Sequence, residues 1–146
     1  MKITVCCSLA FADEAIEVKK SLEGLGFDVY IPITILTCRE EGIKDIKGWI
    51  KGLVAEDPVE FDKLKKERMD LHCKQVEGAD AILVLNYDKD GKKNYIGGNA
   101  LLEMGLAFWL KKPIYLLNDM PEAIDYIEEI RGMMPIVIHG NLNLIK

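Results

Sequence analysis

The feature that most constrains the fold is an alternation of short apolar runs with longer segments of helical periodicity. The clearest run, AILVLN, follows Gly78-Ala79-Asp80 and reads as a buried strand. Because strands that alternate with helices form parallel sheets through right-handed crossovers, this rhythm predicts one α/β domain over residues 1–146. We expect a three-layer α/β/α fold whose five-stranded parallel sheet has the flavodoxin/Rossmann-like order 2-1-3-4-5. The predicted strands are Ile3–Leu9, Phe27–Ile31, Ala79–Asn86, Ile114–Asn118 and Pro135–His139.

Helices are predicted between these strands. The first has apolar residues spaced by three or four, at Ala15, Val18, Leu22 and Leu25. The segment from 34 to 58 mixes charges with glycines and predicts one short helix between mobile connections, and Pro58 suits the first turn of the next helix. The predicted helices are Phe11–Leu25, Ile43–Leu53, Pro58–Val76, Gly97–Leu110 and Glu122–Arg131.

Composition excludes several classes of protein. The net charge is −5, with 19 basic and 24 acidic residues, which argues against a nucleic-acid polymer as partner but leaves room for a small anionic ligand in a local pocket. No apolar run is long enough to span a membrane, and the opening MKITVCCSL resembles no secretory signal, so we expect a cytoplasmic protein with reduced thiols. Four scattered cysteines without a CxxC pair and two histidines predict no metal site, and no cofactor is expected.

Unusual polar residues follow the predicted strands. In open parallel sheets the ligand lies beyond the carboxyl ends of the strands, at the point where the strand order reverses. The candidate binding residues at these ends are Ser8, Phe11, Asn86, Asp88 and Asn118. The loop lysines Lys89, Lys92 and Lys93 are most simply solvated, although they are placed where they could attract a phosphate.

The segment YIGGNALLEMGLAFWLKKP holds the most distinctive polar group. Gly97 and Gly98 begin the predicted helix and allow a ligand to approach free backbone N–H groups. Asn99 and Glu103 are four residues apart and share one helix face. Glu103 stands in an otherwise apolar stretch, where a carboxylate needs a partner or a purpose. From these features alone, a glutamate that reaches solvent or pairs with a lysine is an equally good interpretation.

The order of these motifs resembles the nucleoside 2-deoxyribosyltransferase family, which includes 2'-deoxynucleoside 5'-monophosphate N-glycosidases. The resemblance lies in Ala79-Asp80 with its strand, in the helix that carries Glu103, Gly105 and Ala107, and in Lys112-Pro113 before the next strand. It covers most of the chain and is weakest from Thr34 to Leu64. It implies an enzyme that cleaves or transfers the N-glycosidic bond of a 2'-deoxyribonucleoside or its 5'-monophosphate, with Glu103 as nucleophile in a covalent glycosyl intermediate. It also implies a homodimer or higher homo-oligomer.

The sequence departs from the family pattern at the residue expected to act as the acid. Family members carry an aspartate eight residues before the aspartate corresponding to Asp80, and this position holds His72. A histidine can donate a proton near neutral pH, so His72 is a second candidate catalytic residue. Without the resemblance, a histidine on an amphipathic helix is more simply a surface or core-edge residue. A nucleotide-binding module without turnover is the alternative function, and a flavodoxin-like flavin carrier rests on fold alone.

Overall fold

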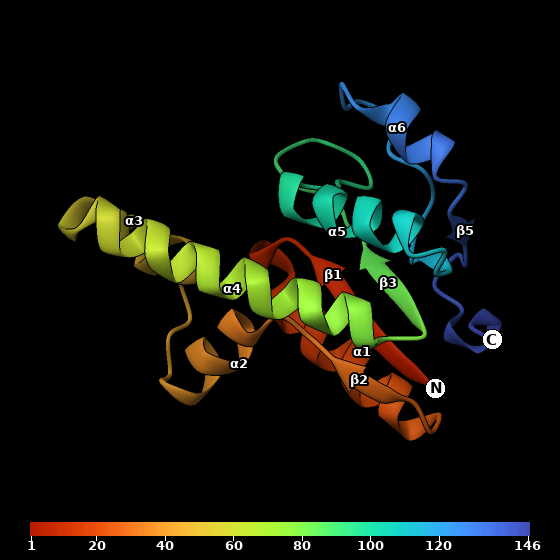
Figure 1. The fold of residues 1–146 in the computed structure, drawn as a ribbon, viewed down its shortest axis with the longest axis horizontal. Helices are drawn as coiled ribbons and strands as arrows, with labels where there is room; N and C mark the ends of the chain where they lie inside the picture. The colour runs from red at the N-terminus through yellow and green to blue at the C-terminus, as the bar shows by residue number, and fades with distance from the viewer.

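The computed structural model describes all residues from 1 to 146 and contains one five-stranded parallel sheet (Figure 1). The strand order is β2-β1-β3-β4-β5, which confirms the predicted order and fold class. The strands are β1 (Lys2–Cys7), β2 (Asp28–Tyr30), β3 (Ala81–Leu85), β4 (Ile114–Leu116) and β5 (Ile136–Val137). The long central pairing joins β1 to β3, from Ile3 opposite Ala81 to Cys7 opposite Leu85.

Six α-helices accompany the sheet. They are α1 (Ala12–Gly24), α2 (Ile33–Glu40), α3 (Ile46–Glu56), α4 (Pro58–Gly78), α5 (Gly98–Trp109) and α6 (Ile127–Gly132). Two short 3-10 helices, Leu9–Phe11 and Leu142–Leu144, follow β1 and β5. No helix combines the length and the apolar character that crossing a membrane would require.

The two faces of the sheet carry separate cores because neighbouring strand residues point to opposite sides. In β1, Val5 and Cys7 pack with α1, whereas Cys6 packs on the other face with residues of α4, α5 and α6. Helices α4 and α5 contact one another on that second face (Figure 1). The predicted opposite orientation of Cys6 and Cys7 is therefore confirmed, and it directs the Cys6 thiol toward α4 and α5.

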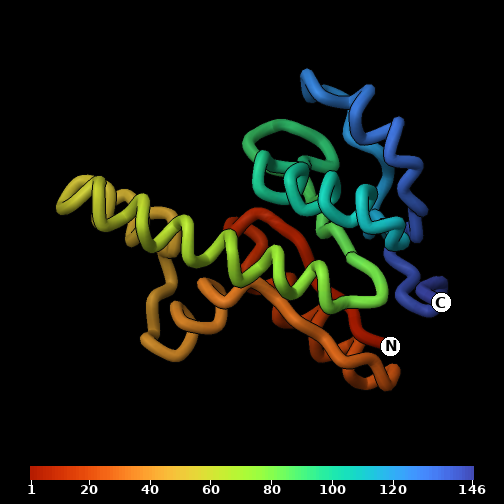
Figure 2. The backbone as a smooth tube through the Cα atoms, in the orientation of Figure 1, coloured from red at the N-terminus to blue at the C-terminus, as the bar shows by residue number.

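Helix α4 is longer than predicted and projects beyond the sheet with α3 (Figure 2). Asp57 caps its amino end, where the carboxylate accepts hydrogen bonds from the backbone N–H groups of Val59 and Glu60, both at 3.1 Å. Pro58 occupies the first turn, as predicted. The helix ends at Gly78 rather than at Val76. The carboxyl half of α4 places His72 next to Cys6 of β1. Helix α4 also packs against α3.

Three sequence predictions were wrong in detail. The segment expected to hold one short helix contains two, because the chain also forms α2 directly after Pro32. The helix predicted from Glu122 starts only at Ile127, and the Tyr126 hydroxyl before it donates a hydrogen bond to the Ile96 carbonyl, which anchors that turn against the loop preceding α5. Strands β4 and β5 are shorter than predicted, with three and two residues.

Candidate active site

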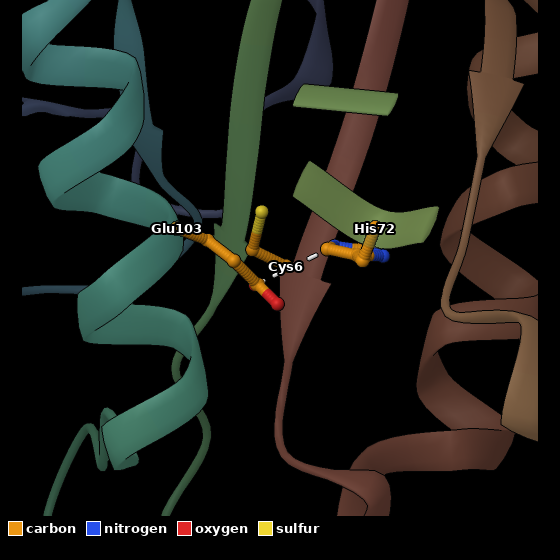
Figure 3. A group of neighbouring side chains, drawn as sticks. All are labelled: Cys6, His72 and Glu103. Carbon is orange, nitrogen blue, oxygen red and sulfur yellow. Dashed lines mark ion pairs between the residues drawn. The ribbon is translucent and has the colours of Figure 1, made fainter. Parts of the chain in front are cut away.

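Glu103 and His72 meet across the space between two helices. Glu103 points from α5 and His72 from α4, and Glu103 Oε2 lies 3.4 Å from His72 Nε2 (Figure 3). Only 14% of the Glu103 side chain and 7% of the His72 side chain are exposed. The structure therefore favours a buried partner for Glu103 over a carboxylate that reaches solvent or pairs with lysine. It also brings together the two residues that the sequence identified as catalytic candidates.

The polar atoms of this pair are incompletely satisfied. Both ring nitrogens of His72 and the Oε2 atom of Glu103 are buried without a hydrogen-bond partner of good geometry. Buried polar groups in folded proteins are nearly always paired, and an unpaired one costs about 1–3 kcal/mol. Such a cost is typical of a site that is completed by a ligand.

Cys6 lies beneath the pair on β1 (Figure 3). Its Sγ atom, a His72 ring nitrogen and a Glu103 carboxylate oxygen all lie within 4.8 Å of one another. Burial raises the pKa of the Cys6 thiol well above its ordinary value, and the neighbouring Glu103 carboxylate raises it further. In the ligand-free site Cys6 is therefore a neutral thiol, which leaves Glu103 free of a competing negative charge.

A narrow pocket opens onto Glu103 and His72. Its volume is about 150 Å³, and most of the apolar residues in its wall come from α3 and α4. Trp49 and Phe61 contribute aromatic rings, while Arg68 and Asn99 add hydrogen-bonding groups. Apolar walls with a few polar groups are characteristic of small-molecule sites. The pocket is smaller than the roughly 300–1,000 Å³ of most ligand sites, so a ligand larger than a sugar or a base must extend beyond it.

A wider groove of about 700 Å³ adjoins this pocket, and both cavities are lined by Leu9 and Ile50. The groove is strongly basic. Its cationic residues are Arg39, Lys44, Lys47, Lys51 and Lys89, against two anionic residues, Asp13 and Asp45. Five positive and two negative side chains leave a local excess of three positive charges on a chain of net charge −5. The groove is suited to an anionic ligand.

Ser8 lies at the wall of the basic groove. Its hydroxyl accepts a hydrogen bond from Lys89 Nζ at 3.1 Å and another from the Ala10 N–H at 3.3 Å. Lys89 Nζ also lies 4.8 Å from the centre of the Tyr95 ring. One of the three loop lysines is therefore drawn toward the strand end. Phe11 behaves differently, because its ring is 4% exposed and packs edge-on against Tyr87 at 5.4 Å between centroids. The interpretation of Phe11 as a ligand contact is not favoured, since its ring belongs to the core.

Asn86 and Asn118 bind each other instead of facing either cavity. The buried Asn86 amide donates to the carbonyls of Asn118 and Asp119 at 3.3 and 2.8 Å, and its carbonyl oxygen accepts from the Asn118 N–H at 2.9 Å. The Asn118 side chain returns a bond to the Asn86 carbonyl at 3.2 Å. These reciprocal hydrogen bonds hold the carboxyl ends of β3 and β4 together. Neither residue lines the two cavities.

Asp88 also has a local structural role. Its carboxylate accepts the Asn94 N–H at 2.9 Å and lies 3.8 Å from Lys93 Nζ, within the loop that joins β3 to α5. Asp88 is exposed and lines neither cavity. The structure thus gives Asp88 a place in the turn rather than in the pocket.

The remaining candidate binding residues lie at the start of α5, and only one of them lines a cavity. Asn99 lines the narrow pocket beside Glu103, as their spacing of four predicts. Gly97 and Gly98 do not line either cavity. A Cβ atom at Gly97 would lie 3.3 Å from the Tyr95 ring and hydroxyl, so the absence of a side chain there accommodates that ring.

Sequence reasoning missed most of the pocket wall. Trp49 of α3 and Phe61 of α4 come from the segment where the sequence resembles the family least, and Arg68 follows shortly after it on α4. Tyr30 was also missed, although its ring lies 5.6 Å from that of His72 and its hydroxyl is buried without a partner. An aromatic residue at the end of a short strand carries no signal by itself. The cationic residues at 39, 44, 47 and 51 could have been noticed as a basic stretch within an acidic chain.

Comparison with known proteins bears on the fold. No protein-family model and no curated protein matches the sequence. Among solved structures, the chain is similar to a 2-deoxyribosyltransferase from the psychrotolerant bacterium Bacillus psychrosaccharolyticus, described as a biocatalyst for the synthesis of nucleosides. The similarity covers 95% of this chain and 99% of the other, with 17% sequence identity and a TM-score of 0.52. The chain therefore has the fold that its sequence motifs imply.

Proposed function

We propose that this protein cleaves or transfers the N-glycosidic bond of a 2'-deoxyribonucleoside or its 5'-monophosphate. The observation that carries the proposal is the buried Glu103 carboxylate, which faces His72 and lines the narrow pocket with it. A solved structure with this fold is described as a 2-deoxyribosyltransferase, which agrees with the proposal. The sequence motifs around Glu103 support it independently of the fold.

Glu103 is the proposed nucleophile. Its carboxylate oxygen attacks the anomeric carbon, a carbon–oxygen bond forms, and the bond from that carbon to the base nitrogen breaks. The electron pair of the broken bond leaves with the base. Water or a second base then attacks the same carbon and releases Glu103. The hydrolase and transferase reactions differ only in this second acceptor.

His72 is the proposed acid. In its protonated form it gives a proton to the departing base, and in its neutral form it accepts one from the incoming water or base. Retaining glycosidases separate their two catalytic carboxyl groups by about 5–5.5 Å, whereas His72 and Glu103 are 3.4 Å apart. Substrate binding must therefore rotate the imidazole away from Glu103. The partnerless His72 Nδ1 leaves a second nitrogen for contact with the base.

The basic groove supports the monophosphate as the preferred substrate. A 2'-deoxyribosyl group at Glu103 would leave its 5' end free to extend past Leu9, which borders both cavities. Lys44, Lys47 and Lys51 form no ion pair within 4.0 Å, so they are available to an added anion. Ser8 and Lys89 lie on the same wall and are suited to a phosphate oxygen.

Release of free base by the purified protein tests the proposal directly. Deoxynucleosides, their 5'-monophosphates and the ribo counterparts are incubated with and without an acceptor base, and free base is separated by chromatography. Glu103→Gln keeps the shape of the side chain but removes the nucleophile, so base release falls by roughly 10³-fold or more. Glu128→Gln, at an exposed residue of α6 that lines neither cavity, is the matched control and keeps full activity. The absence of release from every compound would overturn the proposal.

A nucleotide-binding module without turnover is the second candidate. Two observations favour it: histidine replaces the family's aspartate at position 72, and the His72–Glu103 contact is shorter than a sugar between them requires. In that case the wild type binds a deoxynucleotide without releasing base, and Glu103→Gln retains the affinity. Calorimetric titration of both proteins distinguishes this function from catalysis.

Assembly into a homodimer or higher oligomer remains a prediction from the resemblance. Phe108 and Trp109 near the end of α5 are 46% and 77% exposed, an arrangement compatible with a subunit contact. Sedimentation velocity of the purified chain measures the oligomeric state.

A further inference from the structure

Cys6, His72 and Glu103 form a set of three different metal-ligand types. They come from β1, α4 and α5, and their Sγ, imidazole nitrogen and carboxylate oxygen atoms lie within 4.8 Å of one another (Figure 3). The sequence analysis expected no metal ligand set. The sequence gives no sign of this cluster, because residues 66 and 31 positions apart (72 minus 6, and 103 minus 72) show no motif spacing and meet only in the folded chain.

The set has the properties of a binding site rather than of a packed core. His72 is 6% exposed, and neither of its nitrogens has a hydrogen-bond partner. The Glu103 oxygen that faces it is also without one. The facing His72 nitrogen and Glu103 oxygen thus lie beside the same space as Cys6 Sγ, and a cation bound there would satisfy both of these buried atoms.

We propose that Cys6, His72 and Glu103 bind a Zn²⁺ ion, or a transition-metal ion of similar softness, with the fourth position open to the narrow pocket. A sulfur, nitrogen and oxygen set suits zinc, whereas calcium and magnesium select oxygen ligands. Tetrahedral zinc with bonds of about 2.0–2.3 Å places its ligand atoms about 3.3–3.6 Å apart. The 3.4 Å between His72 Nε2 and Glu103 Oε2 already lies in this range, and Cys6 Sγ must move closer by at most about 1.3 Å.

Metal binding has a balanced proton count. The Cys6 thiol loses its proton to solvent and becomes a thiolate ligand, while His72 and Glu103 bind through a lone pair of an imidazole nitrogen and of a carboxylate oxygen. Because the bound ion occupies the Glu103 oxygen, it competes with nucleophilic attack by that oxygen. Zinc is therefore an inhibitor of the glycosidic reaction, a consequence that rests on the proposed function, whereas metal binding itself does not.

Cobalt spectroscopy of the whole chain tests the site without any substrate. Protein is treated with a chelator, dialysed and titrated with Co²⁺, whose thiolate complexes show a charge-transfer absorption in the near ultraviolet. The expected result is one Co²⁺ per chain, a thiolate band, intense tetrahedral visible bands, and displacement by Zn²⁺. Cys6→Ser loses the charge-transfer band and binds Zn²⁺ at least about tenfold more weakly. The matched control Cys73→Ser, which alters the exposed thiol of α4, changes neither.

Circular dichroism confirms that each variant is folded, and His72→Gln provides a second route should Cys6→Ser not fold. Two results would overturn the proposal. One is a wild-type protein that shows no thiolate band with Co²⁺. The other is equal Zn²⁺ affinity in the wild type and in either site variant, which would place the ion elsewhere, for example at the exposed His139–Asp119 pair with its 2.9 Å separation. Base release by the chelated enzyme is measured separately, so failure of the metal site leaves the proposed catalytic reaction independently testable.

Discussion

His72 Nε2 faces Glu103 Oε2 at 3.4 Å, and both side chains are almost fully buried above β1. The pair joins α4 to α5 and lines the narrow pocket, which shares Leu9 and Ile50 with the basic groove. The two side chains lie within ion-pair distance of each other. Substitution of His72 or Glu103 therefore changes the environment of the other residue. Their separate roles can be distinguished with a substrate whose cleavage requires only one of the two residues.

His72→Gln separates the acid from the nucleophile. Loss of a general acid slows release of a natural base by about 10²–10⁴-fold. An aryl 2-deoxyriboside with an activated phenolate leaving group needs no protonation, so the variant cleaves it at close to the wild-type rate. Glu103→Gln loses activity on both substrates. Equal losses on both substrates in His72→Gln would instead assign His72 to positioning Glu103.

Substitution of Lys47 and Lys51 tests phosphate recognition in the groove. The double variant Lys47→Gln/Lys51→Gln raises KM for the deoxynucleoside monophosphate by about tenfold, or roughly 1.4 kcal/mol, because two cations near the phosphate are lost. KM for the corresponding nucleoside stays unchanged. The difference between wild type and variant shrinks as salt concentration increases. Lys20→Gln, at an exposed residue of α1 that lines neither cavity, is the control. Parallel changes in KM for nucleoside and nucleotide would contradict a phosphate site.

The sequence predicted the sheet and the face of α5 well because these depend on local patterns. The run at β3 specifies a buried strand by itself, and Asn99 and Glu103 share a pocket because four residues make about one helical turn. The pocket wall could not be predicted in this way. It is lined by residues of α2, α3, α4 and α5, and their arrangement depends on packing between segments distant in the chain.

Polar residues at strand ends also show that sequence position alone does not predict which side chains line a pocket. Ser8 and Asn86 both follow apolar strands, yet Ser8 lines the basic groove and Asn86 ties β3 to β4. Position at the carboxyl edge of a sheet predicts proximity to a ligand site but not the direction of a side chain. The convergence of Cys6 with His72 is a further case, since it arises from the alternation of β1 and the packing of α4 on the sheet.

Asn86→Ala destabilises the fold rather than altering substrate affinity. Removal of the amide leaves the carbonyls of Asn118 and Asp119 and one backbone N–H without their partners in a partly buried position, at a cost of about 1–3 kcal/mol. Asn118→Ala removes only the single 3.2 Å bond to the Asn86 carbonyl and costs less. Urea unfolding measures both. An Asn86→Ala variant with wild-type stability and weakened nucleotide binding would contradict this structural role and support Asn86 as a binding residue.

The buried Cys7 thiol makes the free energy of unfolding decrease at alkaline pH. Burial raises the pKa of its thiol far above the ordinary value of 9.0, with smaller contributions from the Glu103 and Glu14 carboxylates. In the unfolded chain the same thiol ionises near 9.0, so above that pH the folded state retains a proton that the unfolded state has lost. The contribution of Cys7 is therefore complete below about pH 8 and falls by about 1.4 kcal/mol per pH unit above 9.

Cys7→Ala removes this dependence while leaving Cys6 and the tyrosines in place, so their effects cancel in the comparison. The free energy of unfolding in urea is measured for both proteins between about pH 8 and about pH 10, where the thiol of the unfolded chain ionises. We expect the difference in stability between wild type and variant to narrow as the pH rises, because only the wild type loses the contribution of a buried thiol. A constant difference across this range would mean that Cys7 ionises as readily in the folded protein as in the unfolded chain, and would place it in contact with solvent through the narrow pocket that it lines.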